Sequence, residues 1–307
     1  MTADSGSRRV HAELALVAVT VVWGSTFVVV KSALVEISTF LFLTLRFSLA
    51  AIVLLVIYRR KLRKRALGPA LIAGTILFIA YVFQTTGLEL TTPSKSAFLT
   101  GLSIPAVPLL NSLVYRVKPR LLDLAGIGIA TCGMVLLTVP AGGFALAGLG
   151  LNRGDLLSFL CALTFALHIV LIGHFSKIHG FETLAAGQIA TAAVWGLLTF
   201  WFAEPLRFKL SIDVAAAVLL TGLLATALAF TTQAWAQQYT SSPRAALIFA
   251  LEPPVAWLTS WALTGERLAN RGKIGAGLIL AGILLVELTR NKVDTDEPLQ
   301  VRADDKV

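Results

Sequence analysis

The stretch that decides the fold extends from Pro243 to Leu288 and has the sequence PRAALIFALEPPVAWLTSWALTGERLANRGKIGAGLILAGILLVEL. It contains an apolar run interrupted by Glu252-Pro253-Pro254, then a polar turn, and then a second apolar run with glycines at 275, 277 and 282. Each run reaches the length of about 20 residues that a helix needs to cross the hydrocarbon core of a bilayer. The stretch therefore predicts two membrane helices, the first of which is bent at its two prolines.

The same pattern occurs earlier in the chain. Pro93 starts an apolar run that contains Pro105, a basic turn follows at 116–120, and the next apolar run has glycines at 126, 128 and 133. Each of these glycines lies 149 positions before its counterpart in the later stretch. A second set of matches has an offset of 142 and pairs Glu13 with Asp155, Trp23 with Phe165 and Arg46 with Gln188. A repeat of membrane-length segments is more typical of transporters than of enzymes.

The composition requires a membrane. The 307 residues are 56% hydrophobic and only 14% charged, with a mean hydropathy of +0.80, which is too apolar for a soluble domain of this size. We therefore expect membrane lipid to surround the chain. The net charge of +9 lies in short turns between apolar segments and not on a basic face interleaved with aromatic residues, so we expect no nucleic-acid partner.

Ten segments are long enough to span the bilayer, and they predict an all-α integral membrane protein with ten transmembrane helices. The segments are 12–30, 38–58, 67–89, 94–115, 121–139, 154–173, 181–203, 212–236, 243–264 and 271–290. The expected organisation is a cytoplasmic N-terminus (1–11), a first repeat (12–139), a periplasmic linker (140–153), a second repeat (154–290) and a disordered cytoplasmic tail (291–307). Because each repeat has an odd number of helices, the second enters the membrane from the opposite side, which gives two inverted five-helix repeats around a central cavity.

Basic residues predict the orientation. In the first half they gather at Arg8-Arg9, in the loop 59–65 and in the turn 116–120, whereas the loops on the other side hold few. Because basic loops stay in the cytoplasm, both termini are expected to be cytoplasmic. The second half shows almost no such bias, so its direction depends on the helix count.

Arg46 and Glu252 lie well away from the ends of predicted membrane helices, where a charge costs at least about 2.5–3.5 kcal/mol. Arg46 has apolar flanks and either binds an anionic group such as a carboxylate or holds helices together. Glu252 is the natural counter-charge of Arg46, and either binds a proton or an ammonium group or makes a structural hydrogen bond. The prolines that follow Glu252 are expected to free the carbonyl groups near residues 249 and 250.

Polar and aromatic residues in the other segments complete a candidate site. The candidate substrate-binding residues are Trp23, Ser25, Thr26, Arg46, Tyr81, Gln84, His168, Gln233, Trp235 and Glu252. Gln84 and Gln233 have the offset of 149 and are expected to lie symmetrically. Such amide, hydroxyl and aromatic groups suit a polar or zwitterionic organic solute, although bonding between helices is the alternative for each residue. His168 is either a proton relay or a satisfied core residue.

Other features of the sequence argue against catalysis. It has no nucleotide-binding loop, nucleophile elbow, metal triplet or paired carboxylates, so we expect no enzyme activity, no cofactor and no metal. A membrane-embedded enzyme or lipid-processing protein remains the alternative, and so does a passive channel. Cys132 and Cys161 lie in apolar runs and are expected to be small buried hydrophobic residues. Lys95, matched with Ala245, is expected to extend to the membrane interface.

Several motifs together resemble one family. Trp23-Gly24-Ser25-Thr26-Phe27, Arg46-Phe47, Glu252-Pro253, Gly265-Glu266-Arg267-Leu268 and the glycine-spaced final helix resemble the drug/metabolite transporter superfamily, specifically its EamA-type ten-helix members. The likeness covers roughly residues 12 to 290 and recurs in both halves. The chain departs from the pattern at Val117-Lys118-Pro119-Arg120, which replaces the Gly-Glu-Arg turn in the first half.

The resemblance implies a secondary transporter of the bacterial inner membrane, with both termini in the cytoplasm and a cavity between inverted repeats. Many members export amino acids or related metabolites, and uptake of a drug or metabolite is the alternative. Carried over by position, Trp23, Ser25, Thr26, Arg46 and Glu252 lie at or near the cavity. We expect a small polar solute that is moved by alternating access, with proton coupling left open, in a monomer or a homodimer.

Overall fold

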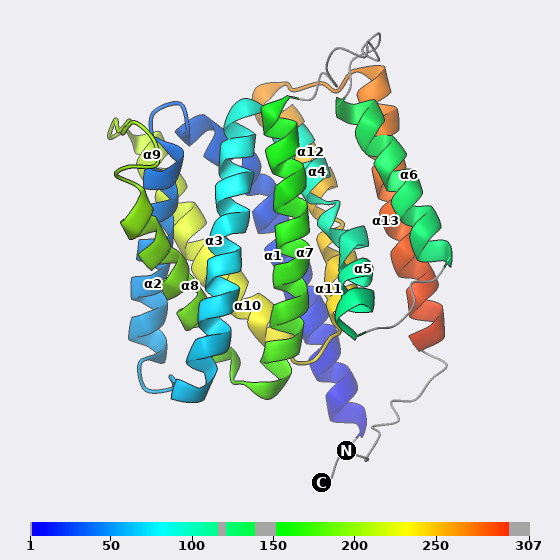
Figure 1. Cartoon of the computed structure of the whole chain (residues 1–307), viewed down its shortest axis with the longest axis horizontal. Coiled ribbons are helices and arrows are strands. Elements are labelled where there is room, and N and C mark those ends of the chain that lie inside the picture. The colour runs from blue at the N-terminus through cyan, green and yellow to red at the C-terminus, as the bar shows by residue number, and fades with distance from the viewer. Residues whose placement is uncertain (1, 116–120, 139–151, 295–307) are drawn as a thin grey trace.

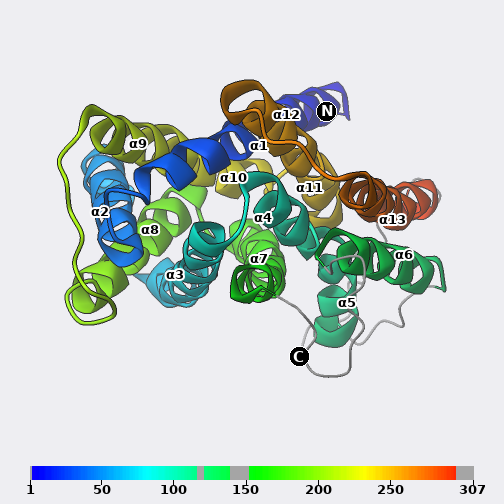
Figure 2. The same cartoon turned by 90° about the horizontal axis from the view of Figure 1, so that it is seen from above.

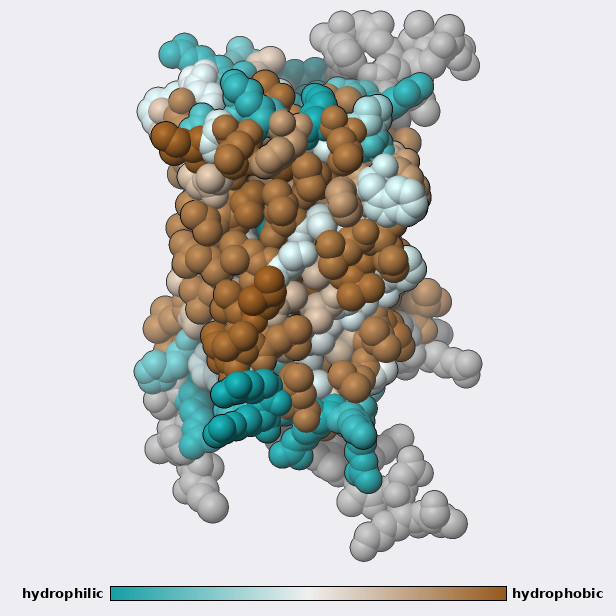
Figure 3. Space-filling model, turned by 90° about the vertical axis from the view of Figure 1, so that its left-hand side faces the viewer, coloured by the Kyte–Doolittle hydropathy of each residue, from teal (hydrophilic) through white to brown (hydrophobic). Residues whose placement is uncertain are grey.

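The computed structural model describes residues 2–115, 121–138 and 152–294, and the long elements in these ranges are helices. They stand side by side in one bundle (Figure 1), and Figure 3 shows a band of hydrophobic side chains between two hydrophilic ends. Six helical stretches among the described residues are long and apolar enough to cross a membrane, namely Arg8–Ala33, Thr39–Tyr58, Lys64–Leu90, Arg153–Ile178, Phe181–Thr199 and Ile212–Ala236. The chain is an all-α membrane protein, as the sequence predicts.

The first half forms α1 (Thr2–Ala33), α2 (Thr39–Tyr58), α3 (Leu67–Leu90), α4 (Pro93–Thr100), α5 (Ser103–Tyr115) and α6 (Leu121–Thr138), with a 3₁₀ turn (Lys64–Ala66) before α3. The second half forms α7 (Arg153–Ile178), α8 (Phe181–Thr199), α9 (Ile212–Gly222), a π-helical turn (Leu223–Leu228), α10 (Ala229–Ala236), α11 (Ser242–Phe249), α12 (Glu252–Thr264) and α13 (Asn270–Asp294). Each of the ten predicted segments coincides with one helix or with a run of consecutive helices.

Two helices extend beyond the predicted membrane spans. Helix α1 begins at Thr2, so residues 2–11 of the predicted N-terminal segment are helical. Helix α13 continues to Asp294, which places residues 291–294 of the predicted tail in a helix, while residues 295–307 lie outside the described ranges. Most of the predicted linker (140–151) and the basic turn at 116–120 also lie outside them.

Two predicted segments are broken inside the bundle, between α4 and α5 and between α11 and α12. The second break confirms the predicted bend, because Pro253 and Pro254 lie in the first turn of α12, where backbone N–H groups have no partner in the helix. Helix α12 ends at Thr264, and the next residue is Gly265, whose φ of 70° is left-handed and favours glycine. The two breaks meet, since a β-carbon on Gly101 would lie 2.8 Å from Cγ of Pro253.

The repeated glycines form a helix contact. Helices α6 and α13 lie side by side at one edge of the bundle (Figure 2). A β-carbon on Gly133 would lie 2.6 Å from the carbonyl oxygen of Gly275, and one on Gly275 would lie 2.6 Å from that of Gly133. Gly282 packs in the same way against the carbonyl of Gly126. Small residues thus allow the two backbones to touch, which is the usual way that helices associate in lipid.

The first helices of the two halves run in opposite directions. Helix α1 begins at the lower end of the bundle in Figure 1, where α13 also ends, and we call this the terminal end. Helix α1 runs from the terminal end to the opposite end, whereas α7, its counterpart in the second half, runs from the opposite end to the terminal end (Figure 1).

Candidate functional site

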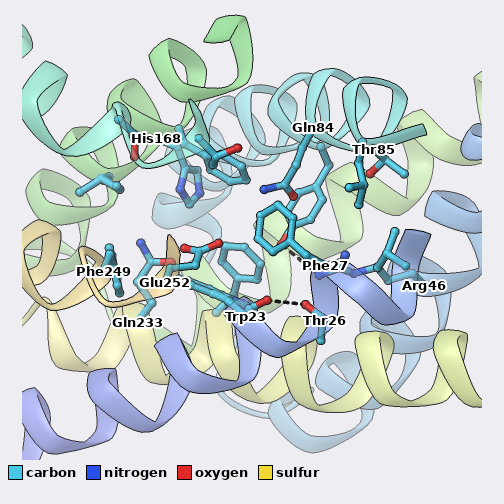
Figure 4. A pocket seen from close by; sticks show the side chains of 18 residues that line it. Trp23, Thr26, Phe27, Arg46, Gln84, Thr85, His168, Gln233, Phe249 and Glu252 are labelled. Carbon is cyan, nitrogen blue, oxygen red and sulfur yellow. Dashed lines mark hydrogen bonds between the residues drawn. The ribbon is translucent and has the colours of Figure 1, made fainter. Parts of the chain in front are cut away.

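A cavity lies inside the bundle where α1, α2, α3, α7 and α10 meet the two broken helices (Figure 4). It offers about 60 Å³ to the centres of water-sized molecules. Its lining consists of Trp23, Thr26, Phe27, Val30, Arg46, Tyr81, Gln84, Thr85, Leu88, Thr100, Ser103, Phe165, His168, Ile169, Phe230, Gln233, Phe249 and Glu252. Eight of the ten candidate residues are therefore together at one cavity, and the exceptions are Ser25 and Trp235.

Arg46 lies in the middle of α2 and is only 3% exposed. Its Nε donates a hydrogen bond to Oγ1 of Thr226 (2.6 Å), and its Nη2 donates to Oη of Tyr81 (3.0 Å) and to the carbonyl of Ala225 (3.4 Å). Its guanidinium carbon also lies 4.4 Å from the centre of the Tyr81 ring. A guanidinium has five N–H donors, and these hydrogen bonds use those on Nε and Nη2. The two N–H groups on Nη1 have no partner among the described residues.

Glu252, the first residue of α12, is half-buried and lines the same cavity. Its carboxylate makes no hydrogen bond and no ion pair with any described residue. The expected pairing of Glu252 with Arg46 is wrong, because the described hydrogen-bond partners of the guanidinium are Thr226, Tyr81 and Ala225. Figure 4 shows the two charged side chains on opposite sides of the cavity. The cavity therefore carries a positive charge at one side and an unpaired acid at the other.

Trp23 forms part of an aromatic wall. Its Nε1 donates to the carbonyl of Ala225 (2.8 Å), and its ring centre lies 5.3 Å from those of both Phe230 and Phe249. The small residue after it allows the close approach that the sequence predicts, since a β-carbon on Gly24 would lie 2.8 Å from the carbonyl oxygen of Glu252. Helix α1 thereby holds the indole ring and the start of α12 at a fixed separation.

Several buried polar atoms at the cavity have no described partner. Nε2 of His168 lies 2.8 Å from Oε1 of Gln188, but Nδ1 of His168 has none. Nε2 of Gln233 donates to Oε1 of Gln237 (3.1 Å), while Oε1 of Gln233 has none. Buried polar atoms normally have hydrogen-bond partners, so a polar ligand or water would stabilise these groups.

The two excluded candidates have other contacts. Oγ of Ser25 donates to the carbonyl of Val21 (2.8 Å), one turn back in α1. Trp235 packs on Tyr239, with 5.5 Å between ring centres.

Of the two cysteines, Cys161 is buried as predicted, but Cys132 is exposed on α6, so the prediction for Cys132 is wrong. Among the described residues, no group of three or more His, Cys, Asp or Glu side chains could hold a metal ion.

The cavity lining follows the repeat offsets. Three pairs of lining residues have the offset of 142, namely Trp23 with Phe165, Thr26 with His168 and Phe27 with Ile169. Four further pairs have the offset of 149, namely Tyr81 with Phe230, Gln84 with Gln233, Thr100 with Phe249 and Ser103 with Glu252. Both members of every pair line the cavity. The charged side chains break this symmetry, since Glu252 is matched by a serine and Arg46 by Gln188. Of the lining residues that the sequence interpretation missed, Phe165, Phe230 and Ser103 could have been found by applying the offsets to the candidates.

Comparisons with known proteins agree with this architecture. Residues 11–139 and 152–288 each match the model of the EamA-like transporter family. An uncharacterized transporter of Archaeoglobus fulgidus is 34% identical over 92% of this chain and 88% of its own length. The uncharacterized inner membrane transporter YedA of Escherichia coli K12 is 24% identical over 89% of this chain and 90% of its own. A solved crystal structure with 21% identity covers 92% of this chain and 99% of its own, with a TM-score of 0.68.

Proposed function

This chain belongs to the EamA-like transporter family, and from that premise we propose that it is a secondary transporter that exports a small zwitterionic metabolite of the amino-acid type. The family makes the chain a membrane transporter. The substrate class, the direction and the mechanism are our proposal, which is developed from the cavity below.

One observation carries the substrate class, namely that Arg46 and Glu252 face one cavity without pairing with each other. The two free N–H groups on Nη1 of Arg46 suit a carboxylate, and the unpaired carboxylate of Glu252 suits an ammonium group. The rings of Trp23 and Phe230 add a surface that attracts cations. A zwitterion with its two charges separated would satisfy both sides at once.

The size of the cavity favours a small solute. A water molecule needs about 10–15 Å³ of such volume, so the cavity volume of about 60 Å³ corresponds to a handful of waters. A solute of amino-acid size fits this space better than a bulky drug. Opening of the bundle during transport would enlarge the space at one end.

We propose that residues 12–139 and 154–290 are inverted repeats that rock about the cavity to expose it to one side at a time. The paired cavity lining and the opposite directions of α1 and α7 support this arrangement. The loop 59–65, with its six basic residues, joins α2 to α3 at the terminal end, which supports a cytoplasmic location for that end and for both termini.

Reconstituted protein tests the proposal. Proteoliposomes are assayed with a panel of labelled amino acids, amines and carboxylic acids, with and without a pH gradient. We expect transport of at least one zwitterion, and a dependence on the gradient if Glu252 exchanges a proton for the solute. Ser25→Ala is the matched control, because Ser25 lies next to Thr26 but outside the cavity. Failure of every zwitterion in the panel, while a singly charged solute is transported, would contradict the proposal.

A further inference from the structure

A buried cluster closes the bundle at the opposite end. Asp155, near the start of α7, accepts a hydrogen bond from Oγ1 of Thr91 (2.7 Å), and Nζ of Lys95 lies 3.4 Å from its other carboxylate oxygen. The Asp155 side chain is only 1% exposed. Lys95 is thus paired with an acid, which the sequence analysis did not predict.

A related cluster lies at the terminal end. Glu13 of α1 accepts from Oγ1 of Thr240 (3.4 Å), and its carboxylate lies 3.6 Å from Nη1 of Arg244. Arg9 also donates to it (3.0 Å). The Glu13 side chain is 30% exposed, so this cluster is looser and wetter than the one around Asp155.

The two clusters are built from equivalent positions. Thr91 and Lys95 precede Thr240 and Arg244 by 149 positions, and Glu13 precedes Asp155 by 142. Helices α4 and α11 begin 149 positions apart, so Lys95 corresponds to Arg244 and its match with Ala245 is wrong. Each cluster joins the first helix of one half to the helix junction of the other half. Each therefore crosses the boundary along which the halves would separate.

We propose that the Asp155 and Glu13 clusters are paired latches that close the two ends of the transport path in alternation, an inference that rests on the proposed alternating access. Rocking of the halves breaks one latch as it tightens the other. The shorter and more buried contacts of the Asp155 latch make this structure the state that is closed at the opposite end.

A seam of contacts leads from the Asp155 latch to the cavity. Along α7 and α4, Oγ of Ser158 lies 3.2 Å from Oγ of Ser96, and Sγ of Cys161 lies 3.9 Å from Oγ1 of Thr100. Thr100 lines the cavity, whereas Cys161 is fully buried. Opening of the latch would separate α4 from α7 and expose Cys161 to water. The thiol is therefore a native reporter of this end.

The test measures the alkylation rate of Cys161 by N-ethylmaleimide in the purified full chain, after Cys132→Ala has removed the exposed thiol. Asp155→Asn, which removes the charge but keeps the shape, is expected to raise the rate by about tenfold or more. Glu13→Gln is the matched control at the other latch, and it is expected to leave the rate unchanged or lower it. Thermal unfolding of each variant shows that it remains folded.

Two results would overturn the proposal of paired latches. One is an alkylation rate of Cys161 in Asp155→Asn within twofold of the parent. The other is an equal rise of this rate in Asp155→Asn and Glu13→Gln, which would indicate general loosening of the fold. Since the assay needs no solute, its outcome is independent of whether the chain transports a zwitterion.

A separate observation concerns the lipid-facing surface. An apolar groove between α3 and α8 offers about 430 Å³ to the centres of water-sized molecules, and Leu62, Leu67, Ala190 and Leu198 are among its lining residues. It follows α8 from residue 187 to residue 198, about 16 Å at 1.5 Å per residue. This length is close to half of the hydrocarbon core, about 15 Å. The groove therefore has the length of an acyl chain in one leaflet.

The groove ends at a strongly basic loop. Leu62 and Leu67 line the groove and flank Arg63, Lys64 and Arg65, which are exposed and whose side chains have no partner among the described residues. From this juxtaposition we infer that the groove and the loop form a site for an anionic phospholipid, with an acyl chain along α8 and the phosphate group at residues 63–65.

Native mass spectrometry of the full chain tests this site with phosphatidylglycerol and phosphatidylcholine of equal chain length. The parent is expected to retain phosphatidylglycerol about tenfold better. The triple variant R63Q/K64Q/R65Q is expected to lose this preference, and Ala190→Phe, which fills the groove, is expected to lose both lipids. Ile52→Phe, on an exposed face of α2 outside the groove, is the control. Equal retention of both lipids by the parent, or displacement of the lipid by inorganic phosphate alone, would overturn the inference.

Discussion

Glu252 occupies in the second half the position that Ser103 occupies in the first, and both line the cavity. Since the first half has a serine at this position, the fold of the pocket does not require a carboxylate there. We predict that Glu252→Gln reduces transport of ammonium-bearing solutes by at least about tenfold, as loss of a buried charged contact usually does. Initial rates in proteoliposomes measure the effect.

Ser103→Ala is the control for Glu252→Gln, because it changes the equivalent position without changing the charge. It is expected to retain most of the parent activity. If Glu252→Gln keeps both the full rate and the full response to a pH gradient, Glu252 has no role in binding or coupling.

Arg46 provides a second prediction, on selectivity. Arg46→Lys keeps the positive charge but loses the planar set of donors that reaches Thr226 and Tyr81. We expect transport of carboxylate-bearing solutes to fall by about tenfold or more, while simple amines are less affected. Competition by paired amine and amino-acid analogues measures the change. An equal loss of folded protein and of transport would assign Arg46 a role in holding helices together.

The glycine contact between α6 and α13 predicts a difference in stability between two neighbouring positions. A β-carbon on Gly133 would meet the Gly275 backbone, whereas one on Gly128 would enter open space. Gly133→Ala is therefore expected to destabilise the protein by about 1–3 kcal/mol. Gly128→Ala is expected to be neutral or stabilising by up to about 1 kcal/mol, since alanine is the better helix former. Thermal unfolding in detergent compares them, and equal effects would contradict the contact.

The loops at the opposite end predict a dependence on pH. Hydrogen bonds from Lys209 and Ser211 lower the pKa of the partly exposed Glu36 carboxyl. Because the folded state favours the charged form, this contact stabilises the fold above the unfolded pKa of Glu36. It is lost as the pH falls through the lowered pKa. Glu36→Gln is expected to speed hydrogen exchange of residues 207–211 at neutral pH and to have no effect in acid; the same increase at both values would exclude the ion pair.

The helices could be predicted from the sequence, because a long apolar segment in lipid satisfies its backbone hydrogen bonds by forming a helix. The bend before Pro253 and the close approach at Gly24 were also predictable, since a missing N–H and a missing side chain have direct steric consequences. The ends of α1 and α13 could not be predicted, because their outer turns are polar and lie outside the apolar runs from which the helices were predicted.

The candidate site was predictable in its members but not in its pairing. Arg46 and Glu252 are the costly intramembrane charges, so each had to face the interior. Which groups they would meet depends on the tertiary packing that brings Thr226 and Tyr81 to the guanidinium. Ser25 failed as a candidate because its hydroxyl has a carbonyl acceptor one turn back in its own helix, an alternative that every serine in a membrane helix has.

The most direct test of the central claim compares three solutes that differ only in charge. An amino acid, the amine that lacks its carboxylate and the acid that lacks its amino group are each exchanged across proteoliposomes that contain the parent protein. We predict that the zwitterion exchanges about tenfold faster than either analogue. Equal exchange of the amine and the amino acid would contradict the claim that Arg46 and Glu252 together hold a zwitterion in the cavity.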